Sequence, residues 1–211
     1  MKYYLYISSA KVDMLYSQIP QGIKSRIATE IKIDLKILST TFKDKEKQSD
    51  ETMYSKLQVV EKHLHEHSEV GTIEEPRSYF HGVLDMRWGE YPDTGIVYFT
   101  GLTGGTAVGL GGSLKHVIGH QNTERLRPLI GSLPNPLLQA LITELRIPIL
   151  QELEDFLFRD EKRLLKVVRQ SLYRVQGTRQ RVEFLAKRLA QEEAKDAKAI
   201  LGTPLYVALA K

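Results

Sequence analysis

The order of strand-like and helix-like patterns is the feature that most constrains how this 211-residue chain can fold. Alternating apolar and polar residues, typical of half-buried strands, fall in the first half, whereas the spacings of three and four that indicate helices dominate the second. Residues 30–38 alternate most clearly, with Ile31, Ile33, Leu35 and Ile37 on one face. This order predicts an α+β fold, in which an antiparallel or mixed sheet from the N-terminal half packs against C-terminal helices.

Further strands and two helices are expected in the N-terminal half. The strand before the turn at residues 92–95 places Phe80, Leu84, Met86 and Trp88 on one face, and it forms a hairpin with the strand that follows. The expected elements are strands at 2–8, 78–91, 96–100 and 106–110, helices at 11–19 and 51–67, and a surface loop at 42–50.

Helical spacing continues through residues 137–190, with boundaries expected at Pro148 and Gly177. The apolar stripe of the last helix is Val182, Leu185 and Leu189. The tail at 202–210 is apolar, so it is expected to dock on the sheet or on a partner chain, and we predict a homodimer on that basis. The whole chain is expected to be a single domain, with a sheet-rich part at 1–132 and a helical part at 133–211.

Composition excludes several kinds of site. There is no cysteine, which excludes disulfides, thiolate zinc sites and thiol nucleophiles. No signal peptide and no apolar stretch of about 20 residues is present, so we expect a cytoplasmic protein that does not enter a membrane. The net charge of +4 permits an anionic partner such as a nucleotide or RNA, and it is equally compatible with an ordinary solvated surface.

A Gly-rich segment is the main candidate site. Glycine lets backbone N–H groups approach a phosphate closely, although neither a P-loop nor a dinucleotide-binding motif is present. The alternative is a tight hairpin with a bulge at a sheet edge. The glycines of this segment are Gly101, Gly104, Gly105, Gly109, Gly111, Gly112 and Gly119.

Three polar side chains at the end of this segment could act on a phosphodiester. Ser113 offers a hydroxyl, Lys115 a cation for the charge on the phosphoryl oxygens, and His116 a group that transfers a proton near neutral pH. We therefore expect these three residues to be catalytic. The expected ligand-binding residues are Lys11, Arg87, Thr103, Gly104, Gly105, Gly111, Gly112 and His120.

Two other groups of residues leave alternatives open. His81, Asp85 and Arg87 share one strand face, which could bind phosphate through the arginine or could be a solvated face with an Asp–Arg pair. The stretch HLHEH at 63–67 contains histidines two positions apart, a spacing that does not bring side chains together on a helix. No HExxH motif is present, so neither a metal nor another cofactor is expected.

Five stretches together resemble a family of uncharacterised bacterial proteins of about this length: KYYLYIS, KVDMLYSQIP, YFTGLTGGTAVGLGGSLKHVIGH, VEFLAKRL and GTPLYVALA. The resemblance covers almost the whole chain and implies cytoplasmic proteins, some encoded near mobile elements or defence genes. Within that group the chain is similar to the small dimeric ring nucleases of type III CRISPR systems. That similarity implies a pocket at a two-fold interface and cleavage of cyclic oligoadenylate through the ribose 2′-hydroxyl without a metal.

Two functions follow as hypotheses. The first is a metal-independent phosphodiesterase, a ring nuclease that cleaves cyclic oligoadenylate messengers in CRISPR or phage defence. The second is a non-catalytic nucleotide-binding or scaffold protein of a bacterial defence system. The expected ligand in both is a cyclic oligonucleotide or another small nucleotide.

Overall fold

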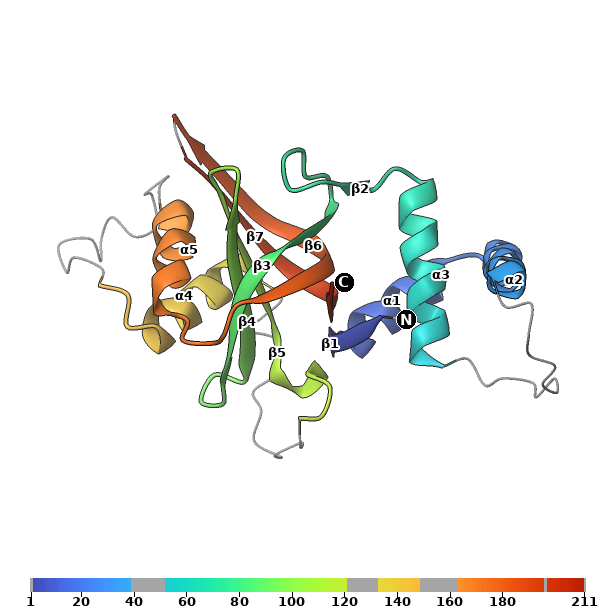
Figure 1. Ribbon diagram of the computed structural model, residues 1–211, viewed down its shortest axis with the longest axis horizontal. Helices are drawn as coiled ribbons and strands as arrows, with labels where there is room; N and C mark the ends of the chain where they lie inside the picture. The colour runs from blue at the N-terminus through green and yellow to red at the C-terminus, as the bar shows by residue number, and fades with distance from the viewer. Residues whose placement is uncertain (1, 39–51, 121–132, 149–162, 196, 211) are drawn as a thin grey trace. The chain divides into compact units, whose positions relative to one another are not determined.

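The structure, a computed structural model, describes residues 2–38, 52–120, 133–148, 163–195 and 197–210 (Figure 1). The chain divides into two compact units, here called the barrel unit (residues 1–8 and 70–211) and the helical unit (residues 9–69). The loop expected at 42–50 lies outside the described residues.

The barrel unit contains the strands and two of the helices. Its elements are β1 (Tyr3–Ile7), β2 (Val70–Gly71), β3 (Tyr79–Tyr91), β4 (Ile96–Thr103), β5 (Thr106–Ser113), the 3₁₀ turn η1 (Leu114–His116), α4 (Pro134–Glu144), α5 (Arg163–Arg174), β6 (Gln180–Ala194) and β7 (Ala197–Leu209).

Five strands of this unit form a closed barrel. Antiparallel pairing joins β3 to β4, β4 to β5, β7 to β6 and β6 to β3, and the ring closes through the parallel pair β5–β7. Strand β1 pairs with the second half of β7, and the short β2 pairs with β3. The barrel therefore uses strands from both halves of the chain.

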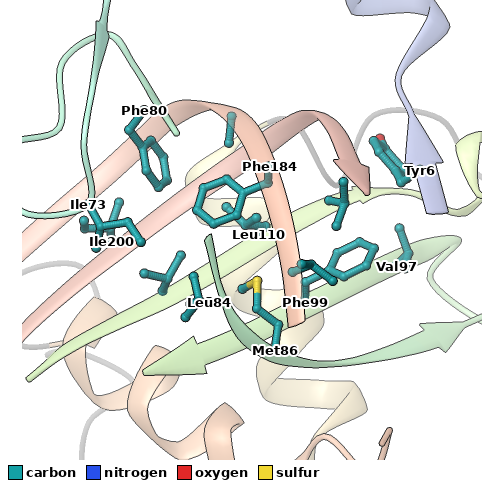
Figure 2. Packing of buried hydrophobic residues seen from close by; sticks show 14 of the residues in the cluster. Tyr6, Ile73, Phe80, Leu84, Met86, Val97, Phe99, Leu110, Phe184 and Ile200 are labelled. Carbon is teal, nitrogen blue, oxygen red and sulfur yellow. The ribbon is translucent and has the colours of Figure 1, made fainter. Parts of the chain in front are cut away.

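Apolar side chains fill the barrel interior. Figure 2 shows Phe80, Leu84 and Met86 of β3 packed against Phe99 of β4 and Phe184 of β6. The face predicted for the 78–91 strand is thus confirmed, because Phe80, Leu84 and Met86 belong to the interior core and Trp88 packs against it. The predicted hairpin between β3 and β4 is confirmed as well.

A second core lies between the outside of the barrel and the helices α4 and α5, which cover this side in Figure 1. Ile96 and Tyr98 of β4 contribute to it from the sheet, and Leu137, Leu141 and Val168 contribute from the two helices. Strand β4 is therefore buried on both faces along most of its length, as the run of buried residues from Ile96 to Gly101 shows.

The predicted α+β arrangement is wrong, because the sheet does not come from the N-terminal half alone. Helical spacing is expected through residue 190, but residues 180–194 form β6. In the strand, Val182 and Phe184 point into the barrel, whereas Leu185 belongs to the other face. The spacings of three and four between Val182, Leu185 and Leu189 resemble a helix stripe, but this stripe does not include the interior residue Phe184. The proposed split into a sheet-rich 1–132 and a helical 133–211 fails for the same reason.

The clearest predicted strand is also wrong. Residues 30–38 are the end of α2 (Gln21–Leu38), which lies in the helical unit with α1 (Ser9–Gln18) and α3 (Met53–Glu66). Ile27 is fully buried and Ile31 half-buried, but Ile33 is 50% exposed, so no single strand face is buried. The side chains of Leu35 and Ile37 lie outside the described part of the chain.

Candidate ligand-binding site

The glycines of the Gly-rich segment have two structural roles. Gly104 and Gly105 have positive φ angles of 51° and 82° and form the two-residue turn between β4 and β5, a conformation that glycine adopts without strain. The strand glycines instead make room for neighbours: a Cβ on Gly109 would overlap the Tyr98 hydroxyl, and one on Gly111 would overlap Leu137. Gly112 faces Tyr6 in the same way.

The predicted catalytic residues lie at the other end of β5. This strand has eight residues, which span roughly 25 Å at about 3.3 Å per residue. Gly104 and Gly105 are thus far from Lys115 and His116, and one phosphate cannot contact both groups. Lys115 is exposed, and the half-buried His116 ring lies edge-on to the Tyr6 ring with centroids 6.0 Å apart.

The remaining predicted ligand residues are dispersed. His120 Nδ1 lies 3.3 Å from Glu90 Oε2, so this histidine is half of an ion pair when it is protonated. Lys11 belongs to α1 of the helical unit. Only Arg87 and Thr103 are brought together, because both line one pocket.

This pocket, here called the arginine pocket, lies on the outer face of β3 and β4 and has a volume of about 480 Å³. The end of α5 contributes Tyr173 to its wall, and the chain that enters β6 contributes Arg179 and Arg181. A volume of this size falls within the range of small-molecule sites.

Positive charge exceeds negative charge in the arginine pocket. Three guanidinium groups, from Arg87, Arg179 and Arg181, meet one carboxylate, from Asp85. Arg181 Nη1 lies 3.6 Å from Asp85 Oδ1, and both side chains are more than half exposed, so this ion pair is weak. The Nε atom of Arg87 is buried and has no hydrogen-bond partner among the described residues.

Apolar side chains are exposed beside these charges. Tyr173 is 84% exposed, and Val83 and Leu102, which also line the pocket, are about half exposed. An exposed apolar patch beside three arginines differs from an ordinary solvated surface, and it matches a ligand that has both an apolar and an anionic part.

The sequence patterns predict Arg87 and Thr103 as ligand-binding residues but do not predict Tyr173, Arg179 or Arg181. The signal for Arg179 and Arg181 is their spacing of two, which is the period of a strand, whereas the surrounding spacings of three and four predict a helix. Pairing of Arg181 with Asp85 in the β3–β6 ladder then brings the arginine to the face that carries Arg87.

Residues 2–211 match a family model described as a family of unknown function, DUF7019. The chain belongs to the DUF7019 family. The match covers nearly the whole chain, in agreement with the resemblance to a family of proteins of this length. No curated protein and no solved structure matches the chain, so its similarity to ring nucleases stays a prediction.

None of the described helices is both long and apolar enough to cross a membrane.

Proposed function

We propose that the arginine pocket binds a nucleotide. The observation that carries the proposal is the excess of three guanidinium groups over one carboxylate beside an exposed aromatic ring. Arginine binds phosphate through two parallel hydrogen bonds, and a tyrosine ring offers a face on which a base can stack. In this arrangement Arg87, Arg179 and Arg181 bind phosphate, and Tyr173 contacts the base.

Burial of the Arg87 Nε atom supports this assignment. A buried donor without a partner costs about 1–3 kcal/mol, and a phosphate oxygen would recover that free energy. Thr103, at the end of β4, adds a hydroxyl to the same wall. The ligand in this proposal is small, because a pocket of about 480 Å³ holds one or two nucleotides rather than a folded nucleic acid.

Binding is tested by isothermal titration calorimetry with AMP, ATP, cyclic tetra-adenylate and ribose 5-phosphate. We expect the nucleotides to bind and Arg179→Ala to weaken binding about 10- to 100-fold, the value of one charged hydrogen bond. Lys115→Ala is the matched control, since it removes a cation at the far end of β5. Equal affinity of wild type and Arg179→Ala, or loss of binding in Lys115→Ala alone, would contradict the proposal.

Cleavage by His116 is a separate proposal that needs a second phosphate site, because His116 lies next to Lys115, at the end of β5 away from Thr103 and the arginine pocket. It is supported by the resemblance and by the proton-transfer chemistry of histidine. The protein is incubated in EDTA with cyclic tri-, tetra- and hexa-adenylate, and products are analysed for 2′,3′-cyclic phosphate ends. We expect linear products and a 100- to 10,000-fold slower single-turnover rate, roughly, in His116→Ala. Intact ligand with and without divalent metal would leave nucleotide binding as the function.

Homodimer formation also stays a prediction, and its original basis has changed. The apolar tail from Leu205 to Leu209 is the end of β7, which pairs with β1 and β6 of its own barrel and is largely buried there. Light scattering at micromolar concentration measures the oligomeric state, and a mass near 24.1 kDa would exclude the dimer.

A further inference from the structure

Two histidines of the helical unit lie together at the end of α3. In the HLHEH stretch, neighbouring histidines are two positions apart, but the first and the last, His63 and His67, are four apart and share a helix face. Their ring centroids are 4.2 Å apart. The spacing of two, which separates side chains on a helix, therefore does not hold for His63 and His67.

A hydrogen bond determines which nitrogen of His67 is available. His67 Nδ1 lies 2.9 Å from the carbonyl oxygen of His63. A carbonyl oxygen only accepts, so Nδ1 carries the proton and the neutral ring keeps a lone pair on Nε2. Histidines that bind metals are oriented in this way, with the second ring nitrogen donating to a backbone carbonyl or a carboxylate.

His63 provides a second nitrogen. Its Nδ1 atom is buried and has no hydrogen-bond partner within the described ranges. Neutral imidazole binds a metal through a ring nitrogen that carries no proton, and an unpartnered ring nitrogen is available for this role.

The surroundings include groups that favour a cation. The pair lies at the C-terminal end of α3, where unpaired carbonyl groups carry partial negative charge. Glu66 adds a carboxylate, although Arg26 contacts it at 2.6 Å. Among the described residues no group of three or more His, Asp or Glu is placed to hold a metal, so any ion here would have two protein ligands and water.

We propose that His63 and His67 bind a late first-row divalent cation through their ring nitrogens. Two nitrogens at 2.0–2.1 Å from one zinc ion lie roughly 3 Å apart, and the centroids of the two imidazole rings are 4.2 Å apart. Imidazole ligands favour copper, nickel and zinc over magnesium. This site is independent of the arginine pocket.

The test is calorimetric titration of the untagged protein at pH 7.5 with nickel chloride, copper chloride and magnesium chloride. We expect copper to bind more tightly than nickel, and magnesium not to bind. His63→Ala should weaken nickel binding about tenfold or more, whereas His65→Ala, on the same helix, should leave it unchanged. Nickel should also raise the unfolding temperature of wild type and not that of His63→Ala.

The His67 side chain donates to the His63 carbonyl at the end of α3, so His67→Asn, which keeps a side-chain donor at this position, is a better variant than His67→Ala. This variant should fold and bind nickel as weakly as His63→Ala. Nickel affinity that is equal in wild type and His63→Ala, or that is lost in His65→Ala, would overturn the proposal, as would no nickel binding at all.

Discussion

Tyr98 shows how single residues join α5 to the barrel. Its hydroxyl lies 3.1 Å from Ser171 Oγ, which also contacts Thr100 Oγ1 at 3.0 Å and donates to the Val168 carbonyl at 2.7 Å. The side chains of Tyr98, Thr100 and Ser171 are all buried, and burial raises the pKa of Tyr98 far above its usual value. The Tyr98 hydroxyl needs the space beside Gly109, which explains a glycine in the middle of a strand.

We therefore expect Gly109→Ala to lower the free energy of unfolding by about 1–3 kcal/mol, the usual cost of overpacking. Tyr98→Phe removes the hydroxyl that the new methyl group would meet. The double variant should be more stable than the sum of the two single changes indicates, as measured by urea unfolding. Additive effects on the free energy of unfolding would show that a Cβ at position 109 does not overlap the Tyr98 hydroxyl.

At the scale of elements, the sequence predicted most of the N-terminal strands and helices but not the architecture. Strands β1, β3, β4 and β5 and helices α1 and α3 match expected segments, because each has a clear period and a turn or proline at its end. Strand β6 was missed because closure of a barrel depends on pairing between distant segments, which no local period reports.

The end of α2 was misassigned for a local reason. Ile23, Ile27 and Ile31 repeat every four residues, and α2 begins directly after Pro20. A window restricted to residues 30–38 contains the alternation of Ile and Lys but not this longer stripe. The expected helix at residues 137–190 affects the candidate site as well, since Arg181 belongs to β6 and Arg179 directly precedes that strand.

A helix and a half-buried strand at residues 30–38 predict different burial for Ile33. In the helix, Ile33 is half exposed and Ile27 is fully buried. We expect Ile33→Lys to change the free energy of unfolding by no more than about 0.5 kcal/mol, and Ile27→Ala to lower it by about 2–5 kcal/mol. Severe destabilisation by Ile33→Lys in chemical denaturation would favour a buried strand at 30–38.

For the whole molecule, β7 is the strand on which closure depends. It pairs with β5, β6 and β1, and its register with β1 joins residues as distant as Tyr3 and Leu209. Removing it opens the ring on two sides and exposes the interior apolar residues to water.

A chain that ends at residue 196 should therefore fail to unfold cooperatively. Trp88, the only tryptophan, stacks on Phe99 with ring centroids 5.6 Å apart and reports on the barrel. We expect the shortened chain to lose the near-ultraviolet circular dichroism signal of Trp88 and to show red-shifted fluorescence, whereas a chain lacking only Lys211 should resemble wild type. A native Trp88 signal in the shortened chain would show that the other strands close without β7.

The position of β7 in the chain also has a consequence during synthesis. A ribosome delivers residues in order, so β5 emerges well before the strand that pairs with its second edge. Until residues 197–209 follow, β5 and β6 each keep an edge that only β7 can cover. Open strand edges of this kind pair with other chains. Before β7 is synthesised, a chaperone can therefore bind the open strand edges of the nascent protein. In the same interval, neighbouring chains can pair with those edges.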